Sequence, residues 1–169
     1  MSMTARELWT VIHGLILGSI YLLAFSGGFV ELWSFLFKEK KEEKEYRLRR
    51  LIRGAWVMAV TCWITVVTGT YVVYPWYRAQ LPDSPRSKLL ADPVKAAWHT
   101  FGMEWKEHVA WASPILATTV AILVSYYGLK ITEKKEWLRV LLIFYVLAFV
   151  SAAVAGIFGA FINKVAPII

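Results

Sequence analysis

Four long apolar runs separated by polar segments dominate the pattern of this chain. Each run holds about 21 to 24 residues without Asp, Glu, Lys or Arg, and the runs cover Leu8 to Val30, Gly54 to Tyr77, Val109 to Leu129 and Val140 to Ile162. About 20 such residues suffice for an α-helix to cross the hydrocarbon core of a bilayer. We therefore predict an all-α fold in which residues 1–169 form a single integral-membrane bundle of four transmembrane helices.

The first apolar run is expected to stay in the protein as a membrane span. It is long for the apolar part of a signal peptide, and Glu7 stands beside Arg6 just before it. Thr4 and Glu7 have the three-residue spacing of a capping box, in which a hydroxyl and a carboxylate bind the unpaired amides at a helix start. The first helix is therefore predicted to begin near Ala5.

The segment between the second and third runs should form an outer loop leading into a long third helix. The stretch Pro82 to Arg86 is rich in turn-forming residues, and Asp92 followed by Pro93 is typical of a helix start. A helix from Pro93 to Leu129 would be about 55 Å long, which exceeds the hydrocarbon thickness. We expect its first part to lie outside the hydrocarbon, to tilt, or to bend near Gly102.

Charge is unevenly distributed along a chain whose net charge is +7. Basic residues concentrate between runs one and two, in the mixed-charge segment Lys38 to Arg53, and again between runs three and four, from Lys130 to Arg139. The positive-inside rule places both of these loops in the cytoplasm and both termini outside it, in a multi-pass protein of the cell (inner) membrane. The reverse orientation stays open, because the outer loop is also basic. Nucleic-acid binding is not expected, because the positive-inside rule already explains why Lys and Arg concentrate in these loops.

Glu31, which directly follows the first run, is the only deep acidic residue, and we expect it to reach the membrane surface or to pair with Arg53. No run carries a charged residue at its centre, so a proton or ion relay is not predicted. The single cysteine, Cys62, lies inside the second run and is expected to be a small residue that faces lipid or the core. It allows neither an internal disulfide nor covalent attachment of haem.

Two histidines, His13 and His108, stand at the entrances of runs one and three. One span separates these runs, so they are parallel and both histidines should lie at the same end of the bundle. Neutral imidazoles are good ligands for haem iron, and two of them give a centre suited to electron transfer. The pair therefore predicts one non-covalently held haem b, with His13 and His108 as metal ligands.

Several neighbouring residues are candidates to line such a haem. Gly14 and Gly18 could admit a flat porphyrin ring or close helix packing. Trp105 and Trp111 could line the haem edge or a quinone pocket, although interfacial anchoring is also typical of tryptophan. Small residues in run four, from Ser151 to Ala160, could likewise admit either a porphyrin ring or a closely packed helix.

His99 competes with His108 as the second ligand. It lies nine residues earlier, so on an ideal helix the two side chains point to opposite faces. A His and Glu site for copper, zinc or iron, using Glu104 with the three histidines, is an alternative to haem. The Glu-x-x-His spacing of di-iron bundles is absent, because Glu104 and His108 are four residues apart.

With His13 and His108 on parallel helices, the chain resembles small four-helix membrane cytochromes b and the haem-carrying anchor subunits of respiratory enzymes. The segments Thr68 to Tyr77 and Glu104 to His108 also resemble those of an uncharacterised family of four-span prokaryotic membrane proteins. The cytochrome resemblance implies an electron-transfer protein or subunit rather than a stand-alone enzyme. Di-haem cytochromes carry four ligating histidines in two pairs, whereas this pattern leaves room for one haem.

The sequence thus predicts electron transfer through one haem b, to or from a quinone, a redox membrane partner or a periplasmic protein. A homo-oligomer is a further possibility for the partner. The alternative is a non-redox accessory or assembly subunit, in which the same helices only pack against another protein.

Overall fold

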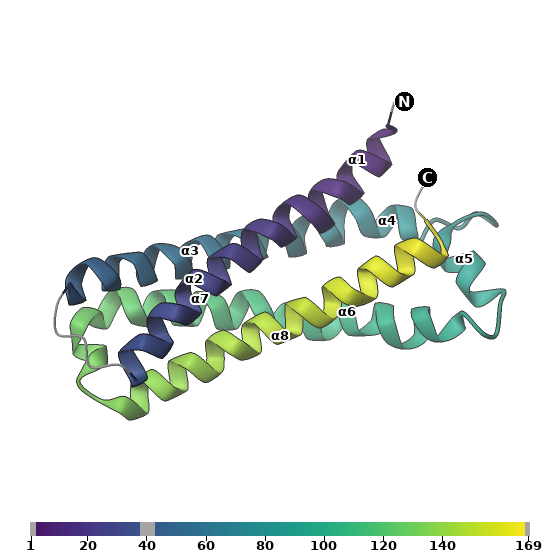
Figure 1. Cartoon of the computed structure of the whole chain (residues 1–169). Helices are drawn as coiled ribbons and strands as arrows, with labels where there is room; N and C mark the ends of the chain where they lie inside the picture. The colour runs from purple at the N-terminus through teal and green to yellow at the C-terminus, as the bar shows by residue number, and fades with distance from the viewer. Residues whose placement is uncertain (1–2, 38–42, 168–169) are drawn as a thin grey trace.

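The computed structural model describes residues 3–37 and 43–167, which form four long helical stretches joined by shorter segments (Figure 1). Span one contains α1 (Ala5–Val11), η1 (Ile12–Ile16) and α2 (Leu17–Phe37), and span two contains α3 (Lys44–Thr68), η2 (Gly69–Val73) and α4 (Tyr74–Tyr77). Span three contains η3 (Trp98–Met103), α6 (Glu104–His108), η4 (Val109–Trp111), α7 (Ala112–Tyr127) and η5 (Gly128–Thr132), and span four is α8 (Lys135–Val165). Segments η1 to η3 are π-helical, and η4 and η5 are 3₁₀-helical.

Each predicted apolar run lies within one of these four stretches, which are long and apolar enough to cross a bilayer. The all-α, four-span membrane bundle is therefore confirmed. The expected capping box is present, because the Thr4 side chain accepts from the Glu7 amide and the Glu7 carboxylate accepts from the Thr4 amide at 2.7 Å. Helix α1 accordingly begins at Ala5.

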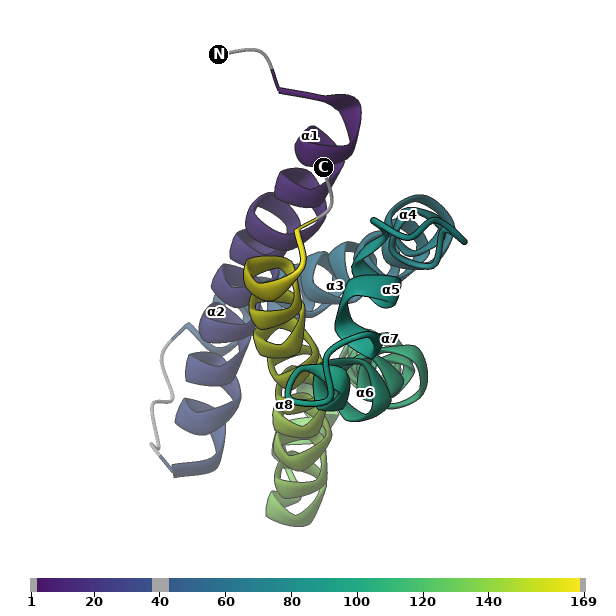
Figure 2. The same ribbon diagram turned by 90° about the vertical axis from the view of Figure 1, so that its right-hand side faces the viewer.

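The spans pack in a ring, in which α2 and α7 each contact both α3 and α8. Spans one and three are therefore diagonal across the bundle, as the end-on view in Figure 2 shows. Neighbouring helices pack at about 8 to 10 Å, so diagonal axes are about 11 to 14 Å apart. At its N-terminal end, α1 leans away from the other helices (Figure 1).

A chain of buried hydrogen bonds joins all four spans near the bundle axis. The Tyr21 hydroxyl donates to the Ala148 carbonyl at 2.8 Å and lies 2.9 Å from Ser113 Oγ, which in turn lies 3.1 Å from Cys62 Sγ. Because the carbonyl can only accept, the Ser113 hydroxyl donates to Tyr21 and the Cys62 thiol donates to Ser113. Of the two positions expected for Cys62, facing lipid or facing the core, the structure shows the buried one, with Ser113 as its polar partner.

A buried ion pair holds α2 against α3 at the end of the bundle that carries the basic loops. The Glu31 carboxylate lies 3.0 Å from Arg47 Nε and 3.4 Å from Arg50 Nε. The expected pairing with Arg53 is wrong, because Arg47 occupies the buried position facing Glu31 and stacks on the Phe35 ring. The mixed-charge segment Lys38 to Arg53 is described from Glu43 onward and is helical from Lys44, while residues 38–42 lie outside the described part of the chain.

The connection from α4 to η3 contains the short helix α5 (Pro85–Leu90), capped by the Ser84 side chain. Asp92 caps a further turn by accepting from the Val94 amide at 3.0 Å, and its carboxylate lies 2.8 Å from Lys95 Nζ. This lysine holds the pKa of Asp92 below its ordinary value. Span three becomes continuously helical at Ala96 rather than at Pro93, because residues 93–95 form turns.

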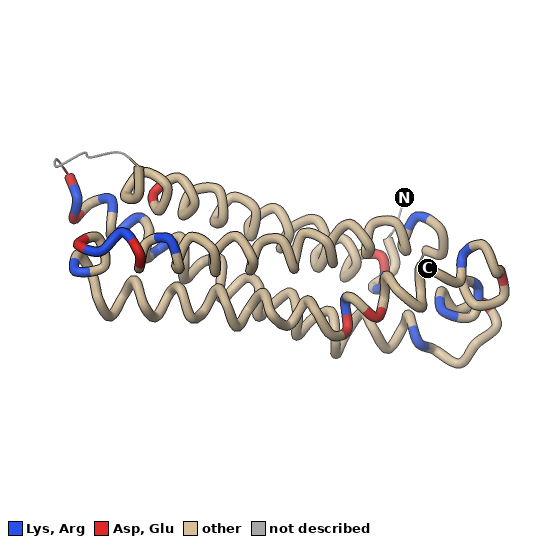
Figure 3. Tube along the Cα trace, turned by 90° about the horizontal axis from the view of Figure 1, so that it is seen from below, with Lys and Arg blue, Asp and Glu red and all other residues tan. Residues whose placement is uncertain are grey.

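The middle of the bundle presents an apolar surface. Lys, Arg, Asp and Glu gather at its two ends in Figure 3, while large apolar side chains such as Leu23 and Ile115 are exposed between them. The indole N–H of Trp56 donates to the Ser125 hydroxyl of α7 at 3.0 Å, and that of Trp63 donates to the Thr118 hydroxyl of α7 at 3.0 Å. Such a surface suits contact with lipid, where unpaired polar groups are costly.

Candidate functional site

The end of the bundle that contains all three histidines, here called the histidine end, is built from irregular helix. His13 lies within the π-helical η1, His99 within the π-helical η3, and η2 begins directly after Thr68, a neighbour of His13. His108 closes α6, immediately before the 3₁₀ segment η4. Mid-helix π and 3₁₀ segments occur frequently at functional sites, so their convergence marks this end as the candidate site.

His13 is held by its Nδ1 atom. Nδ1 lies 3.3 Å from Thr68 Oγ1, whose own hydrogen is directed to the Ile64 carbonyl at 2.7 Å. The Thr68 oxygen therefore accepts from His13, which puts the ring proton on Nδ1 and the lone pair on Nε2. Metal-ligating histidines show this pattern, in which one ring nitrogen is oriented by a hydrogen bond and the other binds the metal.

The lack of a side chain at Gly69 leaves room for the His13 ring to pack against span two. A Cβ atom at this position would lie 2.8 Å from His13 Cε1 and 3.4 Å from Nε2. A side chain larger than hydrogen at position 69 would therefore displace the imidazole. The sequence signal for this contact is weak, because a glycine inside a span has many other uses.

His108 is held in the same way but points elsewhere. Its Nδ1 lies 2.9 Å from the carbonyl oxygen of Glu104, which again puts the proton on Nδ1 and leaves the lone pair on Nε2. The side chain is 72% exposed and also lies 3.5 Å from the Glu104 carboxylate. His108 therefore faces the outside of the bundle.

Lys106 is the residue of α6 that reaches the bundle interior. Its Nζ donates to the Ala155 carbonyl of α8 at 3.2 Å, and a Cβ atom at Gly159 would lie 2.6 Å from that Nζ. Residues two apart on a helix point in nearly opposite directions, so an inward Lys106 requires an outward His108. No hydrogen bond or ion pair joins His13 to His108 in residues 3–37 and 43–167, and the structure does not bring the two rings together.

His99 has a third environment. It is buried, with 6% of its surface exposed, and its Nδ1 lies 2.8 Å from the Tyr77 hydroxyl of α4. As the nine-residue spacing implies, His99 and His108 lie in different surroundings although they share one span. Gly102, the expected bend site, lies inside η3 and packs against Phe158 of α8.

The other predicted lining residues are dispersed. Trp105 packs edge-on against Phe158, and Trp111 packs edge-on against Trp63 of α3. A Cβ atom added at Gly14 or Gly18 would meet nothing within 4 Å in the described chain, so these glycines form no close helix contact there. In α8, Gly159 makes room for Lys106, whereas Ala148 and Ser151 are buried against other helices.

Four buried polar atoms at the histidine end have no hydrogen-bond partner among the described residues. They are Tyr74 Oη, Arg86 Nε, Trp105 Nε1 and Glu107 Oε1. Most buried polar atoms in proteins are paired, so such a group of exceptions is typical of a place where water or a ligand binds. Glu107, Lys106 and Arg86 were not singled out from the sequence, because charged residues near a membrane surface ordinarily face solvent.

No three residues among the described His, Cys, Asp and Glu gather closely enough to hold a metal ion. Glu104 lies beside His108, whereas His13 and His99 have other neighbours. The arrangement thus does not form the His and Glu cluster considered from the sequence.

No protein-family model, curated protein sequence or solved structure matches this chain. Its function must therefore be inferred from the chemistry of the histidine end.

Proposed function

We propose that this protein is a membrane b-type cytochrome that binds one haem at the histidine end and transfers electrons. The observation that carries the proposal is the convergence of π-helical segments at the histidine end, where His13 and His108 each donate from Nδ1 and bear the lone pair on Nε2. When bound, the haem would supply an iron that accepts and releases one electron.

His13 is the better prepared ligand of the proposed pair. Thr68 fixes its tautomer and orientation, and Gly69 leaves room for its ring. Lys106 places an ammonium group inside the bundle with a carbonyl as its hydrogen-bond acceptor and no ion pair to a described residue. An inward cation of this kind suits the carboxylate of a haem propionate.

His108 is the proposed second ligand, but its side chain faces the outside of the bundle in this structure. Its ring has the required tautomer, but Lys106 takes the inward direction of α6. Helix α6 contains five residues between a π-helical and a 3₁₀ segment, and its contacts with α8 include the Lys106 hydrogen bond to Ala155. A ligand role for His108 requires a change in this turn, and His99 remains the competing ligand.

An absorption spectrum of the purified full-length protein, produced in cells supplied with haem, tests the proposal. We expect reduced-minus-oxidised bands of a b-type haem at about one haem per chain. The bands should be lost in His13→Ala and lost or shifted to a five-coordinate form in His108→Ala. Thr10→Ala, at an exposed hydroxyl of the same end that bonds within its own helix, is the matched control and should keep the spectrum.

A colourless, iron-free preparation that is still folded would overturn the haem proposal. It would favour the second candidate function, a non-redox accessory or assembly subunit, for which the outward His108 and the apolar outer surface provide support. Copper, zinc or iron found by elemental analysis without haem bands would instead indicate a metal-ion protein. If His108→Ala retains a six-coordinate spectrum and His99→Ala does not, His99 is the second ligand.

Quinol is a proposed electron donor, alongside a redox membrane protein or a periplasmic carrier. The buried Tyr74 hydroxyl and the Glu107 carboxylate lie beside each other, and both could bond to the hydroxyl groups of a quinol. We propose further that the basic loops face the cytoplasm of a cell with the protein in its inner membrane. The histidine end and both termini would then face outward, within reach of such donors.

A further inference from the structure

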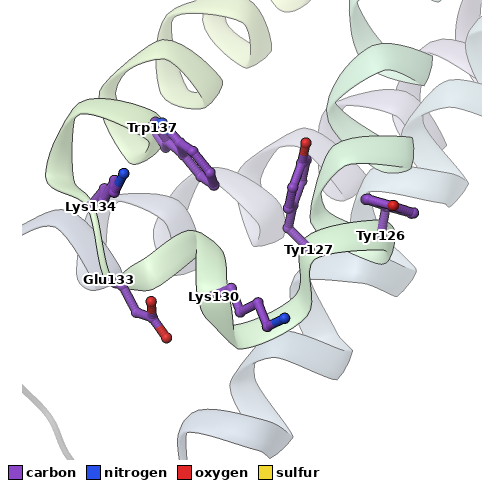
Figure 4. A pocket seen from close by; sticks show the side chains of 6 residues that line it. All are labelled: Tyr126, Tyr127, Lys130, Glu133, Lys134 and Trp137. Atoms are coloured by element: carbon purple, nitrogen blue, oxygen red, sulfur yellow. The ribbon is translucent and has the colours of Figure 1, made fainter.

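A shallow pocket of about 510 Å³ lies at the opposite end of the bundle, where α7 ends and α8 begins. The pocket is lined by the last two residues of α7, by the connection between the helices and by the start of α8. The lining residues are Tyr126, Tyr127, Lys130, Glu133, Lys134 and Trp137 (Figure 4). The proposed haem site does not involve this pocket.

Aromatic rings form the walls of the pocket on the side of the membrane spans. The ring centroids of Tyr127 and Trp137 are 5.3 Å apart, and those of Tyr126 and Tyr127 are 5.0 Å apart. Tyr126 is 80% exposed and Trp137 is 40% exposed, at the ends of two apolar spans. Tyrosine and tryptophan in such positions lie at the level of lipid headgroups.

Two lysines give the pocket a positive charge. Lys134 Nζ lies 5.2 Å from the centre of the Trp137 ring, and Lys130 extends beneath Tyr127 in Figure 4. Neither lysine forms an ion pair with any residue that the structure describes. Glu133, the acidic residue of the pocket, points away from the Trp137 and Tyr127 rings in the same view.

The surroundings reinforce this charge. Lys and Arg gather at this end of the bundle (Figure 3). Those that are exposed include Lys44, Arg49, Arg53, Lys135 and Arg139. A basic pocket between membrane helices, level with the headgroups, is typical of sites that bind anionic lipids.

We propose that this pocket binds the headgroup of an anionic membrane phospholipid. The phosphate lies between the ammonium groups of Lys130 and Lys134, and the glycerol and upper acyl chains contact Trp137 and Tyr126. The lipid, rather than a free anion, is the occupant because the aromatic wall continues into the apolar surface of α7 and α8, which acyl chains cover.

Native mass spectrometry of the full-length protein in detergent tests the proposal, with phosphatidylglycerol and phosphatidylcholine of identical chains as probes. We expect phosphatidylglycerol to bind preferentially. The double variant Lys130→Gln, Lys134→Gln should lose this binding by roughly fivefold for each lysine removed. The control variant Lys44→Gln, Arg49→Gln removes the same charge from the same end, outside the pocket, and should keep it.

Several results would overturn the proposal. Equal binding of the two lipids, or unchanged binding by the pocket variant, would show that the lysines select no anionic headgroup. Equal loss in the control variant would show that diffuse charge is responsible. Displacement of phosphatidylglycerol by inorganic phosphate would show that the pocket takes a free anion instead of a lipid. Circular dichroism of both variants checks that each remains folded.

Discussion

At the residue scale, the closest packing in the bundle depends on glycine. A Cβ atom on Gly28 would meet the Tyr145 hydroxyl and lie 2.7 Å from Tyr145 Cζ, while that hydroxyl donates to the Ala24 carbonyl at 3.0 Å. Gly27, its neighbour, has no atom within 4 Å of the corresponding position in the described residues. Two adjacent glycines of span one thus have opposite packing roles, one facing α8 and the other facing lipid.

We predict that Gly28→Ala lowers the free energy of unfolding by about 1 to 3 kcal/mol, because Tyr145 must move and its hydrogen bond to Ala24 is lost. Gly27→Ala should cause no loss, since alanine favours helix and meets nothing there. Thermal unfolding of both variants in the same detergent measures the difference. Equal stability of the two variants would contradict the packing described for Tyr145.

Ser113 is the second residue whose side chain has consequences beyond its own helix. It is fully buried and connects Cys62 to Tyr21, which connects to Ala148. We predict that Ser113→Ala costs about 1 kcal/mol, because Cys62 loses its acceptor and Tyr21 loses a donor. Ser26→Ala, at an exposed hydroxyl that bonds within its own helix, is the control and should be nearly neutral in the same unfolding assay. A neutral Ser113→Ala would show that the network adds no stability.

At the scale of elements, α2 and α3 are joined by a charge pair as well as by apolar packing. The side chains of Glu31 and Arg47 are 6% and 10% exposed, whereas that of Arg50, the other partner of Glu31, is 51% exposed. A buried pair is costly to break from one side, because the remaining charge stays buried without compensation. The exposed Arg50 interaction is screened by solvent and contributes little.

Glu31→Leu is predicted to destabilise the protein by about 3 kcal/mol, because Arg47 is left without its carboxylate. Adding Arg47→Met should recover much of this loss, and Arg50→Gln alone should cost less than about 1 kcal/mol. A double-mutant cycle from unfolding midpoints separates these effects. Additive losses from Glu31→Leu and Arg47→Met would mean that the two residues do not interact.

At the scale of the whole molecule, the charges divide the bundle into two unlike ends. The basic loops and the aromatic pocket lie at one end, and the histidines, the π-helical segments and both described chain ends lie at the other (Figures 1 and 3). Under the proposed orientation, Val94 faces outward and Lys135 faces the cytoplasm. Both residues are exposed, and Cys62 is buried, so single added cysteines report on the side of the membrane.

We predict that a membrane-impermeant thiol reagent labels Val94→Cys in intact bacterial cells and labels Lys135→Cys only after the cells are opened. The reason is the excess of Lys and Arg in the loops near Lys135, which are retained in the cytoplasm during insertion. The unsubstituted chain, with its buried thiol, is the control for background labelling. The opposite labelling pattern would establish the reverse orientation and place the histidine end in the cytoplasm.

Much of the architecture was determined by the sequence alone. Backbone groups in hydrocarbon must be paired internally, so four long apolar runs require four helices, and Thr4 with Glu7 places the start of the first. An apolar run and a capping box can both be recognised in the sequence, because each depends only on residues that are close along the chain. The predicted start of span three at Pro93 was wrong by a few residues, because Asp92 caps a turn that resembles a helix start and the helix begins at Ala96.

Only the tertiary structure decided which side chains meet. His13 and His108 were predicted at one end of the bundle, but the rotation of α6 about its own axis turns Lys106 inward and His108 outward. The partner of Glu31 likewise changed from Arg53 to Arg47 with the packing of α2 against α3. An apolar run without charge determines that a helix crosses the membrane. The rotation of that helix about its axis follows from packing around π-helical segments and small residues such as Gly69 and Gly159. The order of residues along the chain does not reveal this packing.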